Sequence, residues 1–150
     1  MPNPQGKTFV SPCNVTALRR ATRRATQMYD ALLAPWGLRS TQRSILVHVG
    51  RHGSPTMSEL AAALVLDRSA LNHNLKPLER DGLLTTVVDK NDRRSRLIRL
   101  TKLGETRIKE SQEAWKQAQE RFEAVFGAKQ AADLRVALES IASAEFPEHP

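Results

Sequence analysis

The sequence is poor in several residue types, and each shortage excludes a class of protein. Cys13 is the only cysteine, so no disulfide can form within one chain and no zinc site can use several cysteines. No apolar stretch approaches the length of a membrane span, and Met1–Val10 lacks the apolar core of a signal peptide. These shortages predict a soluble, cytoplasmic protein.

Patterns of catalysis and metal binding are also lacking. The sequence shows no carboxylate pair, no nucleophile with its base and no glycine-rich phosphate loop, so neither an enzyme nor a cofactor is expected. His48 and His52 are four residues apart, a spacing that would put both on one helix face and that could chelate a metal. Because no third ligand lies nearby in the sequence, we expect no metal site.

The chain does have an excess of positive charge, and this excess is unevenly distributed. It contains 23 Lys and Arg against 16 Asp and Glu, a formal net charge of +7. Residues 1–38 have five basic residues and one acidic residue, residues 39–102 have twelve and six, and residues 103–150 have six and nine. A basic region of this kind is typical of proteins that bind phosphate backbones, although ordinary solvated charge is the simpler alternative.

Residues 57–82 have the signals of two consecutive helices. Thr56 and Glu59 form a T-x-x-E capping box ahead of an apolar run. Asp67 is placed to cap a second helix that extends to Arg80, with Leu71, Leu75 and Leu78 spaced to face a core. Gly82 is placed to end this helix as a left-handed glycine. The pattern predicts a helix-turn-helix.

Two β-rich runs follow, Leu83–Val88 and Leu97–Leu100, separated by a polar loop. They predict a hairpin, which after a helix-turn-helix makes a winged fold. A helix fits the major groove of DNA, and a thin basic hairpin can reach the adjacent minor groove. The predicted fold class is therefore mainly α with a small β-wing, and the predicted partner is double-stranded DNA.

The exposed face of the second helix and the hairpin supply the candidate DNA contacts. Arginine can bind guanine, and asparagine can bind adenine, through paired hydrogen bonds. Asp92 is placed to hold the Arg94 guanidinium in one orientation. The alternative is that these are ordinary exposed polar residues. The predicted contacts are Arg68, Ser69, Asn72, His73, Lys76, Lys90, Asp92, Arg93, Arg94 and Arg96.

Helices are also predicted before this region. Ser11-Pro12 has the form of a helix start, with serine as the cap, and this first helix should extend to about Leu33. Arginines crowd one of its sides. Ala34–Gly37 should interrupt the chain, because proline and glycine stop helices. Ser40 or Thr41 is then expected to cap another helix, which ends at Gly50–Gly53.

Helices are predicted after the hairpin as well. Thr101 should cap one long helix from Lys102 to about Phe126, followed by a last helix with Leu134, Leu138 and Ile141 on one face. These apolar faces have few partners within the chain, so we expect a homodimer with a helical base. The predicted organisation is 1–38 as N-terminal arm and first dimerisation helix, 39–102 as DNA-binding lobe, and 103–150 as C-terminal dimerisation helices.

Several of these segments, taken together, closely resemble the multiple-antibiotic-resistance regulator (MarR) family. The resemblance spans about Asn14 to Ala144, and its most specific part is the D-x-R of the hairpin with the I-x-L-T-x-x-G string after it. The matching residues are Met57–Ala61, Leu66–Leu71, Leu75–Glu79, Gly82–Leu84, Asp92–Arg94, Ile98, Leu100–Thr101 and Gly104.

This resemblance implies a homodimeric winged-helix regulator, usually a repressor, that binds a pseudo-palindromic operator. Arg94 would be the minor-groove arginine and Asp92 its partner. Family members typically release DNA when a small phenolic or otherwise anionic aromatic compound binds between the dimerisation base and the DNA-binding lobe. The candidate ligand contacts, which could equally be core residues, are Met28, Tyr29, Leu32, Trp36, Arg39, Gln42, Ile45 and Trp115.

Two alternatives stay open at this point. One branch of the family senses organic hydroperoxides through a cysteine near the first helix, helped by tyrosines. Cys13 and the local sequence at Gln27–Tyr29 resemble that branch, and nearby arginines would favour a thiolate. If Tyr29 is aligned, however, the sensing position falls on Val15 and a second tyrosine position on Arg19. The other alternative is a winged-helix protein-interaction module without DNA binding.

Overall fold

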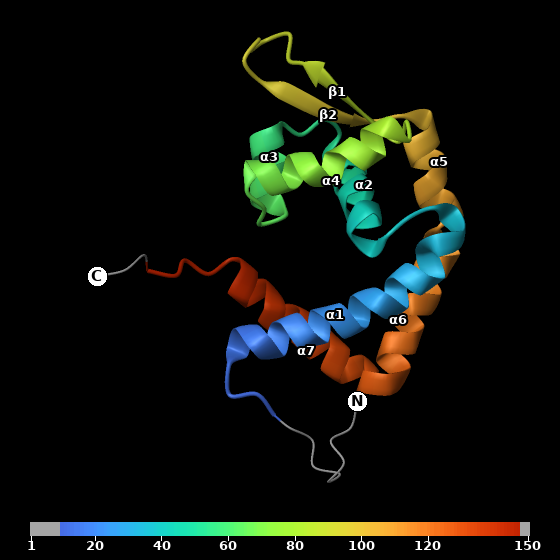
Figure 1. Ribbon diagram of the computed structural model, residues 1–150, viewed down its shortest axis with the longest axis vertical. Helices are drawn as coiled ribbons and strands as arrows, with labels where there is room; N and C mark the ends of the chain where they lie inside the picture. The colour runs from blue at the N-terminus through green and yellow to red at the C-terminus, as the bar shows by residue number, and fades with distance from the viewer. Residues whose placement is uncertain (1–9, 148–150) are drawn as a thin grey trace.

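The computed structural model describes residues 10–147, which form a helical protein with one small hairpin (Figure 1). At one end, helices α2, α3 and α4 pack with strands β1 and β2; α5 leads from there to α6, which lies beside α1 and α7. The predicted fold class is confirmed. The elements are α1 (Asn14–Leu33), η1 (Ala34–Trp36), α2 (Ser40–His52), α3 (Met57–Ala63), α4 (Arg68–Arg80), β1 (Leu84–Val88), β2 (Arg96–Leu100), α5 (Lys102–Glu110), α6 (Gln112–Phe126) and α7 (Ala128–Ala142).

Both helices of the helix-turn-helix begin with a side-chain cap. The Thr56 side chain accepts the Glu59 amide hydrogen at 3.1 Å, and the Glu59 carboxylate accepts the Thr56 amide hydrogen at 2.8 Å. The Asp67 carboxylate accepts the Ala70 amide hydrogen at 2.7 Å at the start of α4. These bonds satisfy donors that have no partner inside the helix. The predicted capping box and the predicted Asp67 cap are both confirmed.

The hairpin follows directly from the end of α4. Gly82 adopts φ +72°, which lets the Leu83 amide hydrogen bond the Leu78 carbonyl at 2.9 Å and turns the chain into β1. Strands β1 and β2 pair antiparallel from Leu84 opposite Leu100 to Val88 opposite Arg96. Both strands lie within one residue of their predicted bounds.

The core lies between the helix-turn-helix, α2 and the hairpin. The buried positions of the helices recur every third or fourth residue, as helical periodicity requires, and Leu84 and Ile98 are the buried residues of the two strands. The predicted inward residues of α4 are all buried. The fully buried large side chains are Leu33, Leu46, Leu60, Leu71, Leu78, Ile98, Val49 and Ser111.

The first helix starts later than predicted. It begins at Asn14 rather than at Ser11-Pro12, and Cys13 is its N-cap residue in extended conformation. The Ser11 hydroxyl accepts the Cys13 amide hydrogen at 3.3 Å, so it closes a turn ahead of the helix instead of capping it.

The cap of α2 also differs from the prediction. Arg39 is the N-cap residue, and Ser40 is the first residue of the helix. The amide hydrogen of Ser40 goes to the Asp30 carboxylate of α1 at 2.7 Å, and that of Arg39 goes to the Gln42 side chain at 2.9 Å. The expected cap by Ser40 or Thr41 is therefore wrong, because other side chains accept these hydrogens.

The long helix predicted for 102–126 is interrupted. Residue Ser111 separates α5 from α6 with ψ near 0°, away from helical values. Its hydroxyl donates to the Ile108 carbonyl at 3.2 Å, the kind of back-bonding that bends helices, and its side chain is fully buried. The interruption places the α5/α6 junction against α2.

Within the described residues, no helix combines the length and the apolar character that crossing a membrane requires.

Candidate nucleic-acid interface

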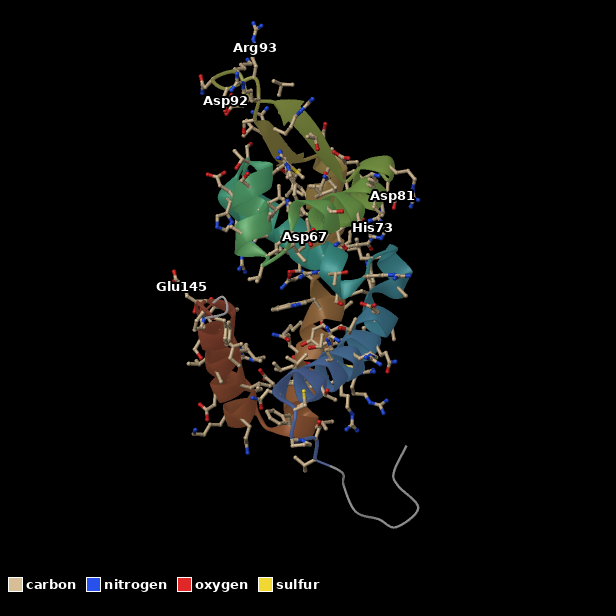
Figure 2. The ribbon with its side chains drawn as sticks, turned by 60° about the vertical axis from the view of Figure 1, so that its left-hand side comes forward. Asp67, His73, Asp81, Asp92, Arg93 and Glu145 are labelled. Carbon is tan, nitrogen blue, oxygen red and sulfur yellow. The ribbon has the colours of Figure 1, made fainter. Side chains whose placement is uncertain are left out.

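The outer face of α4 presents donors to solvent at the start of the helix. The side chains of this face come from positions between the buried leucines, so the same periodicity that fills the core exposes them. Figure 2 labels Asp67, the N-cap residue just before this helix, and His73 of the helix itself. The exposed residues are all five that the sequence predicted here: Arg68, Ser69, Asn72, His73 and Lys76.

The wing tip, residues 89–95, is a compact turn. The Asp89 amide hydrogen bonds the Ser95 carbonyl at 3.0 Å, and the Ser95 amide hydrogen bonds the Asp92 carbonyl at 2.9 Å. The Asp89 carboxylate also accepts the Asn91 amide hydrogen at 2.9 Å. In Figure 2 the Arg93 side chain extends beyond the ribbon at the end of the molecule. The predicted wing residues Lys90, Asp92, Arg93, Arg94 and Arg96 are all exposed.

Asp92 has a different contact from the one expected. Its carboxylate accepts the backbone amide hydrogen of Arg94 at 3.0 Å. The ion pairs within residues 10–147 do not include one between this carboxylate and the Arg94 guanidinium. In this structure Asp92 therefore fixes the backbone of the wing tip rather than the orientation of the arginine side chain.

Helix and wing are also held to each other. The Thr86 hydroxyl of β1 donates to the Glu79 carboxylate of α4. On the far strand, the Ile98 amide hydrogen bonds the Pro55 carbonyl at 2.9 Å, just ahead of α3. The donor-rich face of α4 and the cationic wing tip are thus presented by one packed lobe, and their relative placement is set by hydrogen bonds as well as by the core.

A second feature is a cavity of about 440 Å³ between α1, α2 and the α5/α6 junction. Its size is in the range of small-molecule sites. Of the residues predicted to contact a ligand, Tyr29 and Trp115 lie in its wall. The lining residues are Tyr29, Leu33, Ser40, Arg43, Ser44, Val47, His48, Arg51, Ile108, Gln112 and Trp115.

The other predicted ligand residues lie elsewhere. Ile45 is in the core at 3% exposure, and Trp36 packs against the core. Arg39 and Gln42 line a separate hollow beside α4, together with His73. Met28 and Leu32 are half-buried on α1 outside the cavity lining.

Arg43 is one of the cavity residues that sequence reasoning missed, and it is the one with the most contacts to the other side chains of the wall. Its side chain is 5% exposed, and its burial lowers the pKa of the guanidinium. Nε donates to the Ser111 hydroxyl at 3.0 Å, Nη2 donates to the Gln112 side-chain oxygen at 2.6 Å, and Cζ lies 5.2 Å from the Trp115 ring centroid. The signal was available: Arg43 is three residues before Leu46, on the buried stripe of α2, where a cation is unusual.

Tyr29 and His48 are also perturbed by their position at the cavity. Burial raises the pKa of Tyr29, whose hydroxyl donates to the Gln119 side chain of α6. Burial lowers the pKa of His48, and the neighbouring His52 and Arg51 lower it further. The rings of His48 and His52 stack at 4.3 Å, and within the described chain no group of three ligating side chains could hold a metal ion.

Cys13 is exposed at the start of α1. Hydrogen bonds from Thr16, first from its side chain and then from its backbone, lower the pKa of the thiol. The four arginines of α1 are not the cause of this shift, contrary to the expectation from the sequence.

The chain is similar to known regulators. A protein-family model described as "MarR family" matches residues 36–95 of the chain. Over 87 residues the chain is 32% identical to the organic hydroperoxide resistance transcriptional regulator of Bacillus subtilis strain 168. That match covers 58% of this chain and 59% of the regulator, which is less than two thirds of its length.

Solved structures match over most of the chain. The M. tuberculosis transcriptional regulator MOSR, solved in complex with DNA, is 34% identical with a TM-score of 0.72, covering 86% of this chain and 98% of that one. CouR from Rhodococcus jostii RHA1, solved with p-coumaroyl-CoA, is 24% identical with a TM-score of 0.77, covering 95% and 100%. Given the identity and coverage of the MOSR match and the family match over residues 36–95, this chain belongs to the MarR family of transcriptional regulators.

Proposed function

We propose that the protein is a homodimeric DNA-binding repressor that a small anionic aromatic ligand releases from a pseudo-palindromic operator. The observation that carries this proposal is the part of the structure formed by α2, α3, α4 and the β1/β2 hairpin, called here the wing lobe. It presents the donors of α4 and the arginines of the wing tip to solvent, and the ion pairs of residues 10–147 use none of these arginines. The MOSR structure, which contains DNA, supports the same reading.

In this proposal α4 enters the major groove by its N-terminal end. Arg68, Ser69 and Asn72 lie on the first turns and would meet base edges or phosphates. The wing tip would reach the adjacent minor groove with Arg94, where the narrow groove concentrates negative potential. Lysine and arginine contacts to phosphates would release counterions, so affinity should fall steeply with salt.

Two subunits are needed to read a palindrome. The helices α1, α6 and α7, called here the base, leave apolar side chains uncovered, including Val125 at 91% exposure and Ile141 on α7. A second copy would cover them, as the sequence reasoning expected. Two copies of α4 related by a two-fold axis would then read half-sites about one helical turn, ~10 bp, apart.

The cavity is the proposed ligand site because it adjoins both parts of the molecule. Its wall combines α1 and α6 of the base with α2 of the wing lobe. A ligand that binds better to the spacing of subunits that cannot fit DNA would shift the population away from the DNA-binding form. CouR was solved with an aromatic ligand, p-coumaroyl-CoA, which supports ligand binding in this fold.

A gel-shift with DNA from upstream of the protein's own gene tests the proposal. Arg94→Ala should weaken binding roughly tenfold or more, because one wing contact is lost. Arg121→Ala is the matched control: it removes an equal charge from an exposed position on α6 and should leave affinity nearly unchanged. Equal affinity of Arg94→Ala and the parent, or a flat response to salt, would contradict the proposed DNA contacts. Either result would favour the alternative function, a winged-helix protein-interaction module without DNA binding.

A second candidate signal is oxidation of Cys13. It is favoured by the exposed thiol with a lowered pKa and by the hydroperoxide-resistance relative. Oxidation would place a polar or bulky group at the start of α1. In the ligand-responsive case, Cys13→Ser responds to the inducer like the parent. If peroxide releases the parent from DNA but not Cys13→Ser, the redox candidate is correct and the ligand proposal is wrong.

A further inference from the structure

We propose that the hydrogen bonds from Arg43 to Ser111 and Gln112, called here the Arg43 link, hold the α5/α6 junction to α2, and that a small aromatic carboxylate in the cavity breaks them. This inference rests on the ligand-responsive part of the proposed function. It adds the residue that recognises the charge of the ligand and the contact through which binding changes the structure.

The charge of Arg43 is buried and has no opposite charge beside it. An arginine stays protonated even when buried, and a buried charge is costly unless a counter-charge is near. Both hydrogen-bond acceptors of Arg43 are neutral, and the ion pairs of residues 10–147 do not include it. The cavity wall contains Arg43 and Arg51 but no carboxylate. The site therefore lacks an anion and favours one.

The geometry of the Arg43 link identifies the atoms for which an anion would compete. Carboxylates bind guanidinium groups most strongly through two parallel hydrogen bonds. Nε and Nη2 of Arg43 form one such pair of donors, and Ser111 and Gln112 occupy them with neutral oxygens. A carboxylate that takes both donors forms charge-assisted bonds in their place, and these are roughly twice as strong as neutral ones.

The rest of the wall selects an aromatic body for this ligand. Trp115 lies against the guanidinium, and Tyr29 is in the same wall with the aliphatic side chains of Leu33 and Ile108. A ring held among these side chains would lie beside the arginine that its carboxylate binds. A volume of about 440 Å³ accommodates a small ligand of this kind.

The Arg43 link lies where the structure can bend. Ser111 is the residue at which the backbone leaves helical geometry between α5 and α6. Before it, α5 packs on α2 and β2; after it, α6 packs on α1 and α7. Breaking the link removes a direct tie between α2 and the junction, which allows the wing lobe to turn relative to the base. In a dimer that turn changes the spacing of the two α4 helices.

Benzoate and benzamide test the proposal because they match in shape and differ in charge. Binding to the full chain is followed by calorimetry, without DNA, and backbone exchange at residues 111–115 is followed by mass spectrometry. We expect millimolar benzoate to bind and benzamide to bind about tenfold more weakly or worse. Benzoate should also speed exchange at the junction, and benzamide should not.

Three variants complete the design. Arg43→Met keeps the packing volume, removes the charge, and should lose the preference for benzoate while showing fast junction exchange without any ligand. Ser111→Ala removes one competing acceptor and should bind benzoate more tightly than the parent. Arg121→Met is the matched control for the loss of an arginine and should behave as the parent does.

The proposal is overturned if benzamide binds as well as benzoate, if benzoate does not bind at millimolar concentration, or if it binds without changing exchange at the junction. The comparison of the two compounds uses only the parent protein, so it does not depend on the folding of a variant. A parent that binds benzoate as expected but no DNA would overturn the proposed repressor function and leave the Arg43 link standing.

Discussion

Gly104 is packed so closely against the hairpin that no side chain fits there. A Cβ atom at this position would overlap the carbonyl oxygen of Leu83, which is backbone and cannot rotate away. We expect Gly104→Ala to lower the free energy of unfolding by about 2–3 kcal/mol or more, as overpacking in a rigid site does. Urea unfolding at one fixed protein concentration measures this.

Gly50→Ala is the control for Gly104→Ala. Its added Cβ would lie 2.9 Å from Cδ1 of Leu100, the end of a flexible side chain that can move. A smaller loss, or a gain from the better helix propensity of alanine, is expected. Equal losses in the two variants would show that the backbone contact of Gly104 is not the cause.

Val65 is strained in the turn between α3 and α4. It has φ +51°, a left-handed conformation that costs an L-residue about 1–2 kcal/mol, and it is 67% exposed, so packing contributes little there. We expect Val65→Gly to raise the free energy of unfolding by about 0.5–1 kcal/mol, after allowing for the greater freedom of glycine in the unfolded chain. The same change at exposed, helical Val136 should destabilise, and destabilisation by both would contradict the assigned strain.

At the scale of single elements, the wing tip separates two roles for Asp92. If the carboxylate acts by accepting the Arg94 amide hydrogen, an asparagine can replace it and an alanine cannot. We expect Asp92→Ala to weaken operator binding by about 1 kcal/mol, roughly fivefold, and Asp92→Asn to bind nearly as the parent does. A gel-shift compares them. If both variants are equally weak, the negative charge matters and the orientation of the guanidinium is the better explanation.

The cap of α3 should make stability depend on pH. Hydrogen bonds from Thr56, first from its backbone amide, lower the pKa of Glu59 in the folded protein. Because the folded pKa lies below the unfolded one, the contribution of Glu59 is present above the ordinary pKa of a glutamate and is lost as pH falls through the folded pKa. Urea unfolding at pH 7 and near pH 4 should show that the parent loses more stability than Glu59→Gln. Identical losses would contradict this linkage.

The local elements could be predicted from the sequence, because their signals lie within a few residues. The caps at Thr56 and Asp67, the left-handed Gly82 and the two β-rich runs around a polar loop are all short-range features. The interruption at Ser111 could not be predicted in this way. It accompanies a buried contact between Ser111 and Arg43, which lies 68 residues earlier in the sequence. The apolar periodicity of a helix gives no information about a contact over such a separation. The start of α2 was missed for the same reason, since Asp30 on another helix accepts the amide hydrogen of Ser40.

The candidate sites show the same difference between short-range signals, which the sequence contains, and contacts between distant segments, which it does not show. All ten predicted DNA contacts are exposed, because an outward position follows from helix and hairpin periodicity alone. Of the eight predicted ligand contacts, Tyr29 and Trp115 line the cavity, because a pocket depends on how helices distant in sequence meet. The resemblance to the MarR family, stated from motifs, is confirmed by the family match over residues 36–95 together with a 34% identical regulator over most of the chain.

At the scale of the whole molecule, the base has exposed apolar side chains and an uneven distribution of charge, and both bear on the proposed dimer. Exposed apolar side chains of α6 and α7 include Phe126, Val136 and Ile141. The arginines of α1 are exposed, and residues 103–150 have nine acidic residues against six basic ones. A second copy could therefore bury the apolar faces while placing α1 near acidic helices, which favours two-fold association over open aggregation.

Ile141→Asp tests this association. A carboxylate at a face that a second subunit covers would be buried without a partner, which costs several kcal/mol, so the dimer dissociation constant should rise about a hundredfold or more. Light scattering over a range of concentrations measures the mass. Val65→Asp adds the same charge at an exposed apolar position in the helix-turn-helix and should leave the mass unchanged.

Because two copies of α4 are needed to read both half-sites, Ile141→Asp should also weaken operator binding more at low protein concentration than at high concentration. A parent that is monomeric at micromolar concentration, or an Ile141→Asp variant with unchanged mass, would show that α7 does not form the interface.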